Sequence, residues 1–335
     1  MERLFDPDIW REVTGGAIGE RVRRLTRVTP LVPAPALGRR TGADVWLKLE
    51  SLQRTGSFKL RGALARLCAV ARDAAAPAGR PRVIAASAGN HGLGVALAAE
   101  ALNIDATILV SAQTPELKRA GIRALGAQVE VAGATYDEAE AAARARAAAE
   151  PGLVFVSAFD DDYVIAGNGG LLAREIMAQL PDVEQIVVPV GGGGLAGGIG
   201  VEVVPRGIRL LGVSPEVNCA MRRSLDEGRA YTTYDGGPTL AEGLEGAVSE
   251  RTFAMARDYF PEITLVSEVA IRRAIVYAYR SLGILCEASA APALATLLED
   301  PALVRGKRVV VLISGGNIEP DLVDQLLAGT VTSSS

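Results

Sequence analysis

The sequence predicts an α/β protein built on parallel β-sheets. Short apolar segments alternate along the chain with Ala-rich helical segments of roughly ten to fifteen residues, which is the pattern of βαβ units. Apolar residues make up 49 % of the chain and charged residues 22 %, a composition typical of globular proteins and too apolar for a disordered one. The length of 335 residues suggests two domains or one large α/β body.

The elements follow in order from the apolar pattern. A helix is expected over 8–24, and a proline-broken extended stretch comes after it. The segment 44–50 alternates apolar and polar residues, so it predicts a strand with Lys48 on its outward side. The remaining strands are expected at 83–87, 106–110, 128–133, 153–157, 186–190, 209–213 and 308–314. The remaining helices are expected at 57–72, 91–102, 115–125, 136–149, 165–180, 195–203, 218–227, 268–282, 288–299 and 320–328.

Charge, cysteine and histidine content restrict the possible partners. The net charge is only −4 and the charges are dispersed, which argues against binding to nucleic acid or to an anionic membrane. Cys68, Cys219 and Cys286 are widely spaced and odd in number, which favours a reducing, cytoplasmic compartment. No signal peptide and no long apolar run is visible. The single histidine, His91, excludes zinc sites that need several histidines of one chain.

Three loops rich in small residues each follow a predicted strand and precede a predicted helix. They are SAGNHG at 87–92, GGGGLAGG at 191–198 and SGGN at 314–317. Ligands of open α/β sheets bind beyond the carboxyl ends of the strands. If their strands are neighbours, these loops form one site.

The glycine run at 191–194 predicts a phosphate-binding loop. Glycines allow close approach to backbone N–H groups, and the following helix start carries partial positive charge. A tight turn with close helix–strand packing is the alternative explanation. Gly192, Gly194 and Gly197 also match the dinucleotide motif GxGxxG, but the acidic residue that this motif requires is represented only by Glu216, in an unsuitable place.

One lysine of the chain's four is a candidate for chemistry. Lys59 is expected in the first turn of a helix, where a positive charge is unfavourable for the helix dipole. Lys48, Lys118 and Lys307 have ordinary explanations on a strand, on a helix and in a turn. A lysine can be deprotonated and form a Schiff base, whereas arginine cannot. A phosphate cradle together with one reactive amine is what pyridoxal 5′-phosphate requires.

Four motifs in register carry a family resemblance: LKLESLQRTGSFKLRGA, AASAGNHGLGVALAA, VVPVGGGGLAGGI and VLISGGN. They resemble the fold-type-II pyridoxal-phosphate enzymes, above all the threonine/serine dehydratase and serine racemase group. The resemblance runs from about Thr29 to Asn317. It implies two open, mainly parallel twisted sheets with flanking helices, and a cofactor in the cleft between two domains. It further implies a large cofactor-binding domain of 1–52 and 155–330, a small domain of 53–154, and a homodimer.

The resemblance also implies roles for single residues. Lys59 is similar to the Schiff-base lysine, and Phe58 to the residue stacked near the cofactor ring. Glu287 resembles the acidic residue near the ring, and Ser314 the partner of the pyridine nitrogen. The loop similar to the phosphate site consists of Gly191, Gly192, Gly193, Gly194 and Leu195. The loop similar to the substrate-carboxylate site consists of Ser87, Ala88, Gly89, Asn90 (which would also meet the ring hydroxyl) and His91.

Departures from the family pattern narrow the reaction. Ser314 is a neutral hydroxyl, so the ring would be a weaker electron sink, which suits β-elimination. By the resemblance, Ala88 stands at the position where racemases of the group carry a residue with a second hydroxyl. His91 stands at the position where sulfhydrylases of this fold carry a threonine. Ser214 and Ala220 stand where metal-dependent members carry acids, so no metal is expected there.

We therefore expect a pyridoxal-phosphate-dependent ammonia-lyase (dehydratase) of amino-acid metabolism. Its expected substrate is a small L-β-hydroxy amino acid such as threonine or serine, and its products are a 2-oxo acid and ammonia. The alternatives are a racemase or β-replacement enzyme on the same scaffold, an NAD-dependent oxidoreductase, and a non-catalytic protein that binds a cofactor or amino acid.

Overall fold

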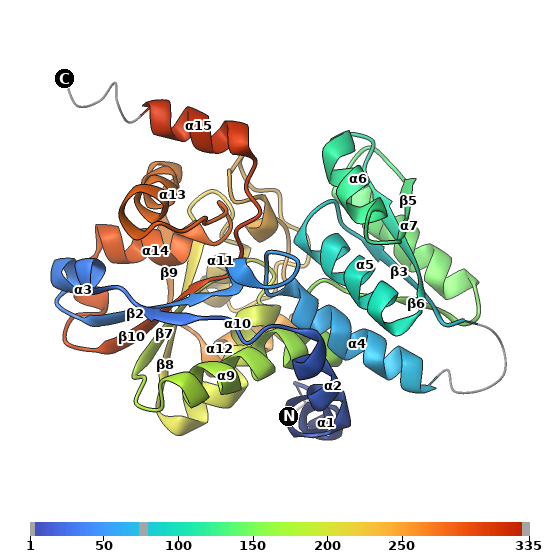
Figure 1. Ribbon diagram of the computed structural model, residues 1–335, viewed down its shortest axis with the longest axis horizontal. Helices are drawn as coiled ribbons and strands as arrows, with labels where there is room; N and C mark the ends of the chain where they lie inside the picture. Colours follow the sequence, from blue (N-terminus) through green and yellow to red (C-terminus); the bar gives the residue numbers. More distant parts are fainter. Residues whose placement is uncertain (1–3, 74–79, 330–335) are drawn as a thin grey trace. The chain divides into compact units, whose positions relative to one another are not determined.

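The computed structural model describes residues 4–73 and 80–329, so residues 1–3 and 330 of the predicted large domain lie outside the described part. The described chain divides into two compact units. Unit 1 consists of residues 1–27 and 58–171, and unit 2 of residues 28–57 and 172–335. Figure 1 shows the elements of both units coloured along the sequence.

Unit 1 contains a four-stranded parallel sheet in the order β5-β4-β3-β6. Its strands are β3 (Arg82–Ala86), β4 (Asp105–Val110), β5 (Gln128–Val131) and β6 (Leu153–Phe155). Its helices are α1 (Pro7–Gly15), α2 (Ala17–Leu25), α4 (Lys59–Asp73), α5 (Asn90–Leu102), α6 (Glu116–Arg123), α7 (Tyr136–Ala149) and α8 (Asp162–Ile165), followed by the π-helical turn η2 (Ala166–Gly170).

Unit 2 contains a six-stranded sheet in the order β1-β2-β10-β7-β8-β9, in which only the β1–β2 pair is antiparallel. Its strands are β1 (Leu31–Pro33), β2 (Asp44–Leu49), β7 (Gln185–Pro189), β8 (Arg209–Pro215), β9 (Ile263–Val266) and β10 (Arg308–Ile313). Its helices are α3 (Pro35–Thr41), α9 (Leu171–Gln179), α10 (Gly194–Val203), α11 (Ala220–Glu227), α12 (Glu250–Tyr259), α13 (Glu268–Leu282), α14 (Ala291–Glu299) and α15 (Pro320–Gly329). The predicted class, α/β with two mainly parallel sheets and flanking helices, is confirmed.

The central strands of unit 2 are continuous apolar runs because the sheet is covered on both faces. Every residue of β7 is buried, and β10 is buried from Val309 onward. Val187, Val311 and Ile313 share a core with Leu294 of α14 and Ile275 of α13.

Several expected elements differ from the structure. The helix expected over 8–24 is two helices, because Gly16 adopts an extended conformation that ends α1 and begins α2. The helix expected over 165–180 is interrupted by η2. Short segments that form α3 and β9, and the helix α12, were not expected. A proline at the first helical turn of α3 starts that helix rather than breaking it.

The predicted domains, 1–52 with 155–330 and 53–154, are a different partition from the two compact units. The two partitions differ in where they assign the first helices. The prediction assigns them to the large domain, whereas α1 and α2 pack with α4 and η2 in unit 1. The domain boundaries stay a prediction.

The prediction that Lys48 faces outward is wrong. Its side chain is fully buried in unit 2, and its Nζ donates to Glu175 Oε1 at 2.6 Å and to the Thr29 carbonyl at 2.7 Å. Gln179 Oε1 accepts a third hydrogen bond at 2.7 Å. Because α9 covers this second face of β2, the alternation along the strand does not separate a buried face from a solvated one.

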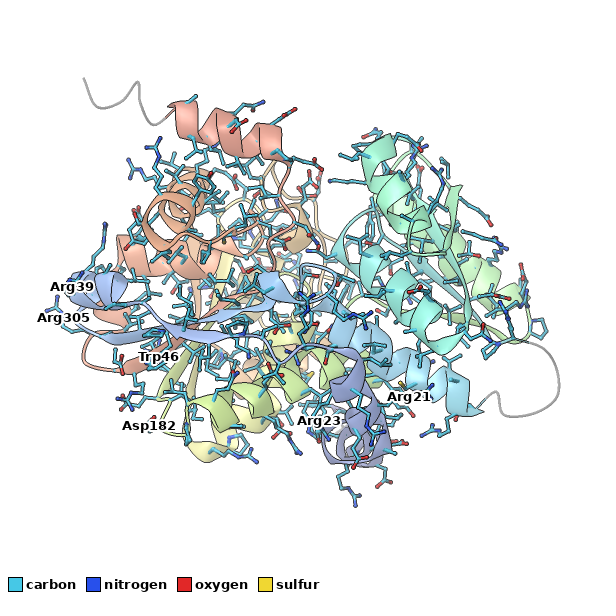
Figure 2. The ribbon with its side chains drawn as sticks, viewed as in Figure 1. Arg21, Arg23, Arg39, Trp46, Asp182 and Arg305 are labelled. Carbon is cyan, nitrogen blue, oxygen red and sulfur yellow. The ribbon has the colours of Figure 1, made fainter. Side chains whose placement is uncertain are left out.

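The topology brings particular loops to one edge of each sheet. In unit 2 the neighbouring parallel strands β2, β10 and β7 are followed by residues 50–57, 314–317 and 190–193. In unit 1 the neighbours β3 and β6 are followed by residues 87–89 and 156–161. The side chains labelled at Arg39, Asp182 and Arg305 belong to segments that precede β2, β7 and β10 (Figure 2), so they mark the amino-terminal edge of the unit 2 sheet.

None of the helices in the described part of the chain is long and apolar enough to cross a membrane.

Candidate active site

Lys59 is the first residue of α4, close to its expected place in the helix. Its Nζ donates to the carbonyl oxygen of Ala158 at 2.8 Å and lies 5.3 Å from the centroid of the Phe58 ring. Ala158 follows β6, so the amine is held at the carboxyl edge of the unit 1 sheet. A cation at a helix N-terminus is unfavourable for the helix dipole, and the carbonyl offsets part of that cost.

The loop at 87–92 leads from β3 into α5, as expected. Gly89 donates its N–H to Ser87 Oγ at 3.1 Å, and no side chain caps the start of α5 at Asn90. The position where a Cβ of Gly89 would lie has no neighbouring atom within 4 Å. Ala88, next to it, is half-buried. Uncapped N–H groups beside open space suit a carboxylate, which the helix dipole attracts.

His91 is buried in unit 1, and its Nε2 lies 3.0 Å from the Val156 carbonyl oxygen. Because a carbonyl can only accept, Nε2 carries the hydrogen. Burial lowers the pKa of His91 to about 3, and the charge of Lys59 acts in the same direction, while the hydrogen bond to Val156 opposes them. The imidazole is therefore neutral at physiological pH, and it ties the first turn of α5 to the loop after β6.

The glycine loop leads from β7 into α10 in unit 2. Gly193 adopts φ +90°, which disfavours other residues, and a Cβ on Gly191 would lie 2.8 Å from Leu244 Cα. No side chain caps α10, which begins at Gly194 and continues with the buried Leu195. The first N–H groups of α10 and the backbone of Gly192 thus form a cradle that suits a phosphate.

Ser314 and Glu287 lie at the same edge of unit 2. Ser314 is buried directly after β10. A Cβ on the next residue, Gly315, would lie 2.5 Å from the Glu287 carboxylate, so this glycine admits the acid. The Glu287 N–H donates to the Gly315 carbonyl at 3.1 Å, and Glu287 Oε2 accepts the N–H of Asn317 at 3.2 Å.

The segment that leads to Lys59 is fastened to this loop. Asn317 Nδ2 donates to the Thr55 carbonyl at 2.8 Å, and the Gly316 N–H donates to the Gly56 carbonyl at 2.9 Å. Ser57 forms an isolated antiparallel β-bridge with Gly315. A single residue, Phe58, therefore separates this bridge in unit 2 from Lys59 in unit 1.

Two hydroxyls of this segment have no hydrogen-bond partner among the described residues. They are Thr55 Oγ1 and Ser57 Oγ, both buried. A buried hydroxyl without a partner costs about 1–3 kcal/mol, so such groups are typical of ligand sites.

Comparison with known proteins places this geometry in a family. Residues 22–315 match the family described as "Pyridoxal-phosphate dependent enzyme". The chain belongs to this family. An L-threonine ammonia-lyase from Thermotoga maritima is 40 % identical over 92 % of this chain and 77 % of its own. A maize serine racemase structure superposes with a TM-score of 0.86 at 26 % identity, over 98 % of this chain and 99 % of its own. The processed form of threonine deaminase isoform 2 from Solanum lycopersicum gives a TM-score of 0.84 at 31 % identity, over 98 % and 95 %.

The described residues fit pyridoxal phosphate, the cofactor of the family. The loop 191–195 carries backbone N–H groups of the kind that a phosphate requires, and a Cβ is absent at four of its positions in succession. Lys59 has an amine of the kind that an aldehyde requires, and Ser314 has a neutral hydroxyl. The orphaned hydroxyls of Thr55 and Ser57 are further polar groups for a bound molecule.

Two residues, Ser214 and Ala220, stand at the positions where metal-dependent members are expected to carry acids, and neither has a carboxylate. Ser214 Oγ donates to the Val190 carbonyl at 2.7 Å, and Ala220 begins α11. Within residues 4–73 and 80–329, no three His, Cys, Asp or Glu side chains gather as a metal site would require.

Some site residues of this pyridoxal-phosphate family member were not expected from the sequence. Ala158 acts through its carbonyl, which no side-chain pattern reveals. Asn317 belongs to the SGGN motif, but its tie to Thr55 depends on strand order.

Proposed function

We propose that this chain is a pyridoxal-phosphate-dependent ammonia-lyase that acts on a small L-β-hydroxy amino acid such as L-threonine or L-serine. The observation that carries the proposal is the amine of Lys59, held by the Ala158 carbonyl at the start of α4 in a chain 40 % identical to an L-threonine ammonia-lyase. The products would be a 2-oxo acid and ammonia.

We propose that pyridoxal phosphate is the cofactor of this chain. When bound, pyridoxal phosphate supplies an aldehyde for amines and a ring that accepts electron density from the substrate Cα. Gly191, Gly192, Gly193, Gly194 and Leu195 would hold the phosphate. Phe58, Asn90, Glu287 and Ser314 would contact the ring.

The substrate half of the proposal involves unit 1. The N–H groups at the start of α5 and the loop Ser87, Ala88, Gly89, Asn90 and His91 would bind the substrate carboxylate. The Lys59 amine, displaced by the substrate amine, would take the proton from Cα. The proton taken by Lys59 would leave with the β-hydroxyl as water, and addition of water to the released enamine would give the 2-oxo acid and ammonia. The neutral His91 would contribute no charge to this site, so the backbone N–H groups would supply the attraction for the carboxylate.

Racemisation is the second candidate, favoured by the likeness to the maize serine racemase structure. A racemase needs a second proton-moving group on the opposite face of Cα, and Ala88 has no hydroxyl to serve there. We therefore place elimination first. Conversion of L-serine to D-serine faster than to pyruvate would reverse this order.

The test is a panel of amino acids assayed for ammonia and 2-oxo acid, with wild type, Lys59→Ala and the control Lys118→Ala on α6. Wild type and Lys118→Ala should deaminate threonine or serine, and Lys59→Ala should lose at least about a thousandfold in turnover. Borohydride reduction followed by peptide mapping should place the cofactor on Lys59. Normal turnover by Lys59→Ala would refute the proposal.

Three further expectations belong to this proposal. The chain is proposed to act in the cytoplasm. It is also proposed to form a homodimer, and light scattering on the cofactor-loaded enzyme measures its molar mass. NADH titration should show no binding to the glycine loop.

A further inference from the structure

The π-helical turn η2 is an unusual element of unit 1. All five of its residues are buried, and four of them are Ala or Gly. The fifth is Asn168, which is only 3 % exposed. Single π-turns within helices are uncommon, and they frequently accompany functional sites.

The side chain of Asn168 reaches the first turn of α4. Its Oδ1 accepts the N–H of Gly62 at 2.8 Å. The preceding N–H, that of Arg61, donates to the Phe58 carbonyl at 3.0 Å. The opening N–H groups of a helix need acceptors from outside its own ladder, and Asn168 provides one of them.

Two facing glycines allow η2 to lie directly on α4. A Cβ on Gly62 would lie 2.6 Å from Asn168 Cγ. A Cβ on Gly167 would lie 2.8 Å from both the Arg61 carbonyl oxygen and Gly62 Cα. The backbones of α4 and η2 therefore lie close together, with only the Asn168 side chain and the Ala65 methyl group beside them at this contact.

Lys59 is held from two other sides in the same unit. A Cβ on Gly94 of α5 would lie 3.2 Å from the Lys59 carbonyl carbon and oxygen, so the α5 backbone packs closely against Lys59. Its amine bonds to Ala158 at the other end of the side chain. The backbone of the helix turn that carries Lys59 is thus set by Gly94 and Asn168 together.

We propose that Asn168 is a positioning residue for Lys59. It fixes the first turn of α4 through the Gly62 N–H, and this sets the direction in which the Lys59 amine leaves the helix. The inference rests on the proposed function, because it concerns the lysine that would bind the cofactor aldehyde.

The test compares Asn168→Leu, which keeps the size of the side chain but removes the acceptor, with Asn168→Asp, which keeps the acceptor. Thr41→Val is the control, since it deletes a buried hydroxyl bond to Leu37 in α3 of unit 2. Each purified apoprotein is mixed with pyridoxal phosphate, reduced with borohydride at set times and mapped by mass spectrometry. Steady-state kinetics and thermal unfolding are measured in parallel.

Asn168→Leu should slow labelling of Lys59 about tenfold or more and lower kcat by a similar factor, with KM changed less than about threefold. Asn168→Asp should retain most of the wild-type labelling rate and of kcat. In Thr41→Val, Lys59 should be labelled at the wild-type rate. Labelling of Asn168→Leu at the wild-type rate would overturn the inference. If Asn168→Leu does not fold, Asn168→Ser takes its place. Equal labelling rates in the Asn168→Ser and Asn168→Asp variants, both below the wild-type rate, would then overturn the inference. Failure of wild type itself to label at Lys59 would instead refute the proposed function.

Discussion

His91 donates its Nε2 hydrogen to the Val156 carbonyl in unit 1, and this bond joins the first turn of α5 to the loop after β6. The loop after β6 also accepts the Lys59 amine, because Lys59 Nζ donates to the carbonyl of Ala158, two residues beyond Val156. The only histidine of the chain is thus a neutral structural donor beside the proposed carboxylate site.

The pH dependence of His91 is the first prediction. Its folded pKa of about 3 lies below the usual value of 6.5, so the unfolded state binds more protons between those two values. The stability contributed by this group is complete above the unfolded pKa and falls by about 1.4 kcal/mol per pH unit as pH drops through that window. Nuclear magnetic resonance of histidine-labelled protein should show no imidazole titration between about pH 7.5 and 5.

The control is His91→Gln, which keeps a donor but does not titrate. Urea unfolding of this variant should lose less stability than wild type between about pH 7 and 5. An imidazole that titrates near its ordinary value in the folded protein would contradict the prediction.

The buried pair of Lys48 and Glu175 gives the second prediction. Glu175→Gln removes the carboxylate that Glu175 presents to the fully buried Lys48 ammonium, and it should cost about 3–5 kcal/mol of unfolding free energy. Urea unfolding measures the loss. The exposed pair of Arg11 and Asp8 is the control, and Arg11→Gln should cost less than about 0.5 kcal/mol. Equal losses of unfolding free energy in the two variants would contradict the prediction that the buried pair contributes more to stability than the exposed one.

The glycine cradle gives the third prediction. Gly193→Ala combines a positive φ with a Cβ placed 2.5 Å from Met221 Cε, so it should weaken pyridoxal phosphate binding at least about tenfold. Gly207→Ala is the matched control, because φ there is +77° with no atom within 4 Å of a Cβ. Both variants should pay the left-handed strain of roughly 1–2 kcal/mol. Fluorescence titration with pyridoxal phosphate measures the affinity of each variant for the cofactor. An unchanged affinity in Gly193→Ala would contradict the proposal that the glycine loop binds the phosphate.

The tie between Asn317 and Thr55 gives the fourth prediction. Asn317→Asp replaces the donor Nδ2 with an oxygen that repels the Thr55 carbonyl. Amide hydrogen exchange should then quicken at Gly316, whose N–H bonds to the Gly56 carbonyl, and leave the centre of α14 unchanged. Exchange at the wild-type rate in that peptide would show that Asn317 does not fasten the segment.

Sequence reasoning predicted the fold class and most elements because these depend on local patterns. Helices α7 and α13 begin and end at the expected residues, since Thr135 and Ser267 are caps that sequence reveals. The extended stretch with three prolines contained a helix, because a proline in a first turn favours rather than breaks it. The broken helix around η2 was missed, because a π-turn depends on what packs against it.

The candidate site divides in the same way. Lys59, the glycine loop and the SGGN motif were visible because residue type and order along one chain reveal them. The partners of His91, Lys48 and Asn168 were not visible, since they lie 65, 127 and 106 residues away in sequence.

The sequence by itself determined the strand and helix periods, the scarce lysine and the small-residue loops, since these are properties of neighbours along the chain. Only the tertiary structure decided which charges are buried and which donors meet which acceptors. Burial depends on whether a second layer covers a face, and hydrogen bonds depend on strand order, so neither can be read from a single segment.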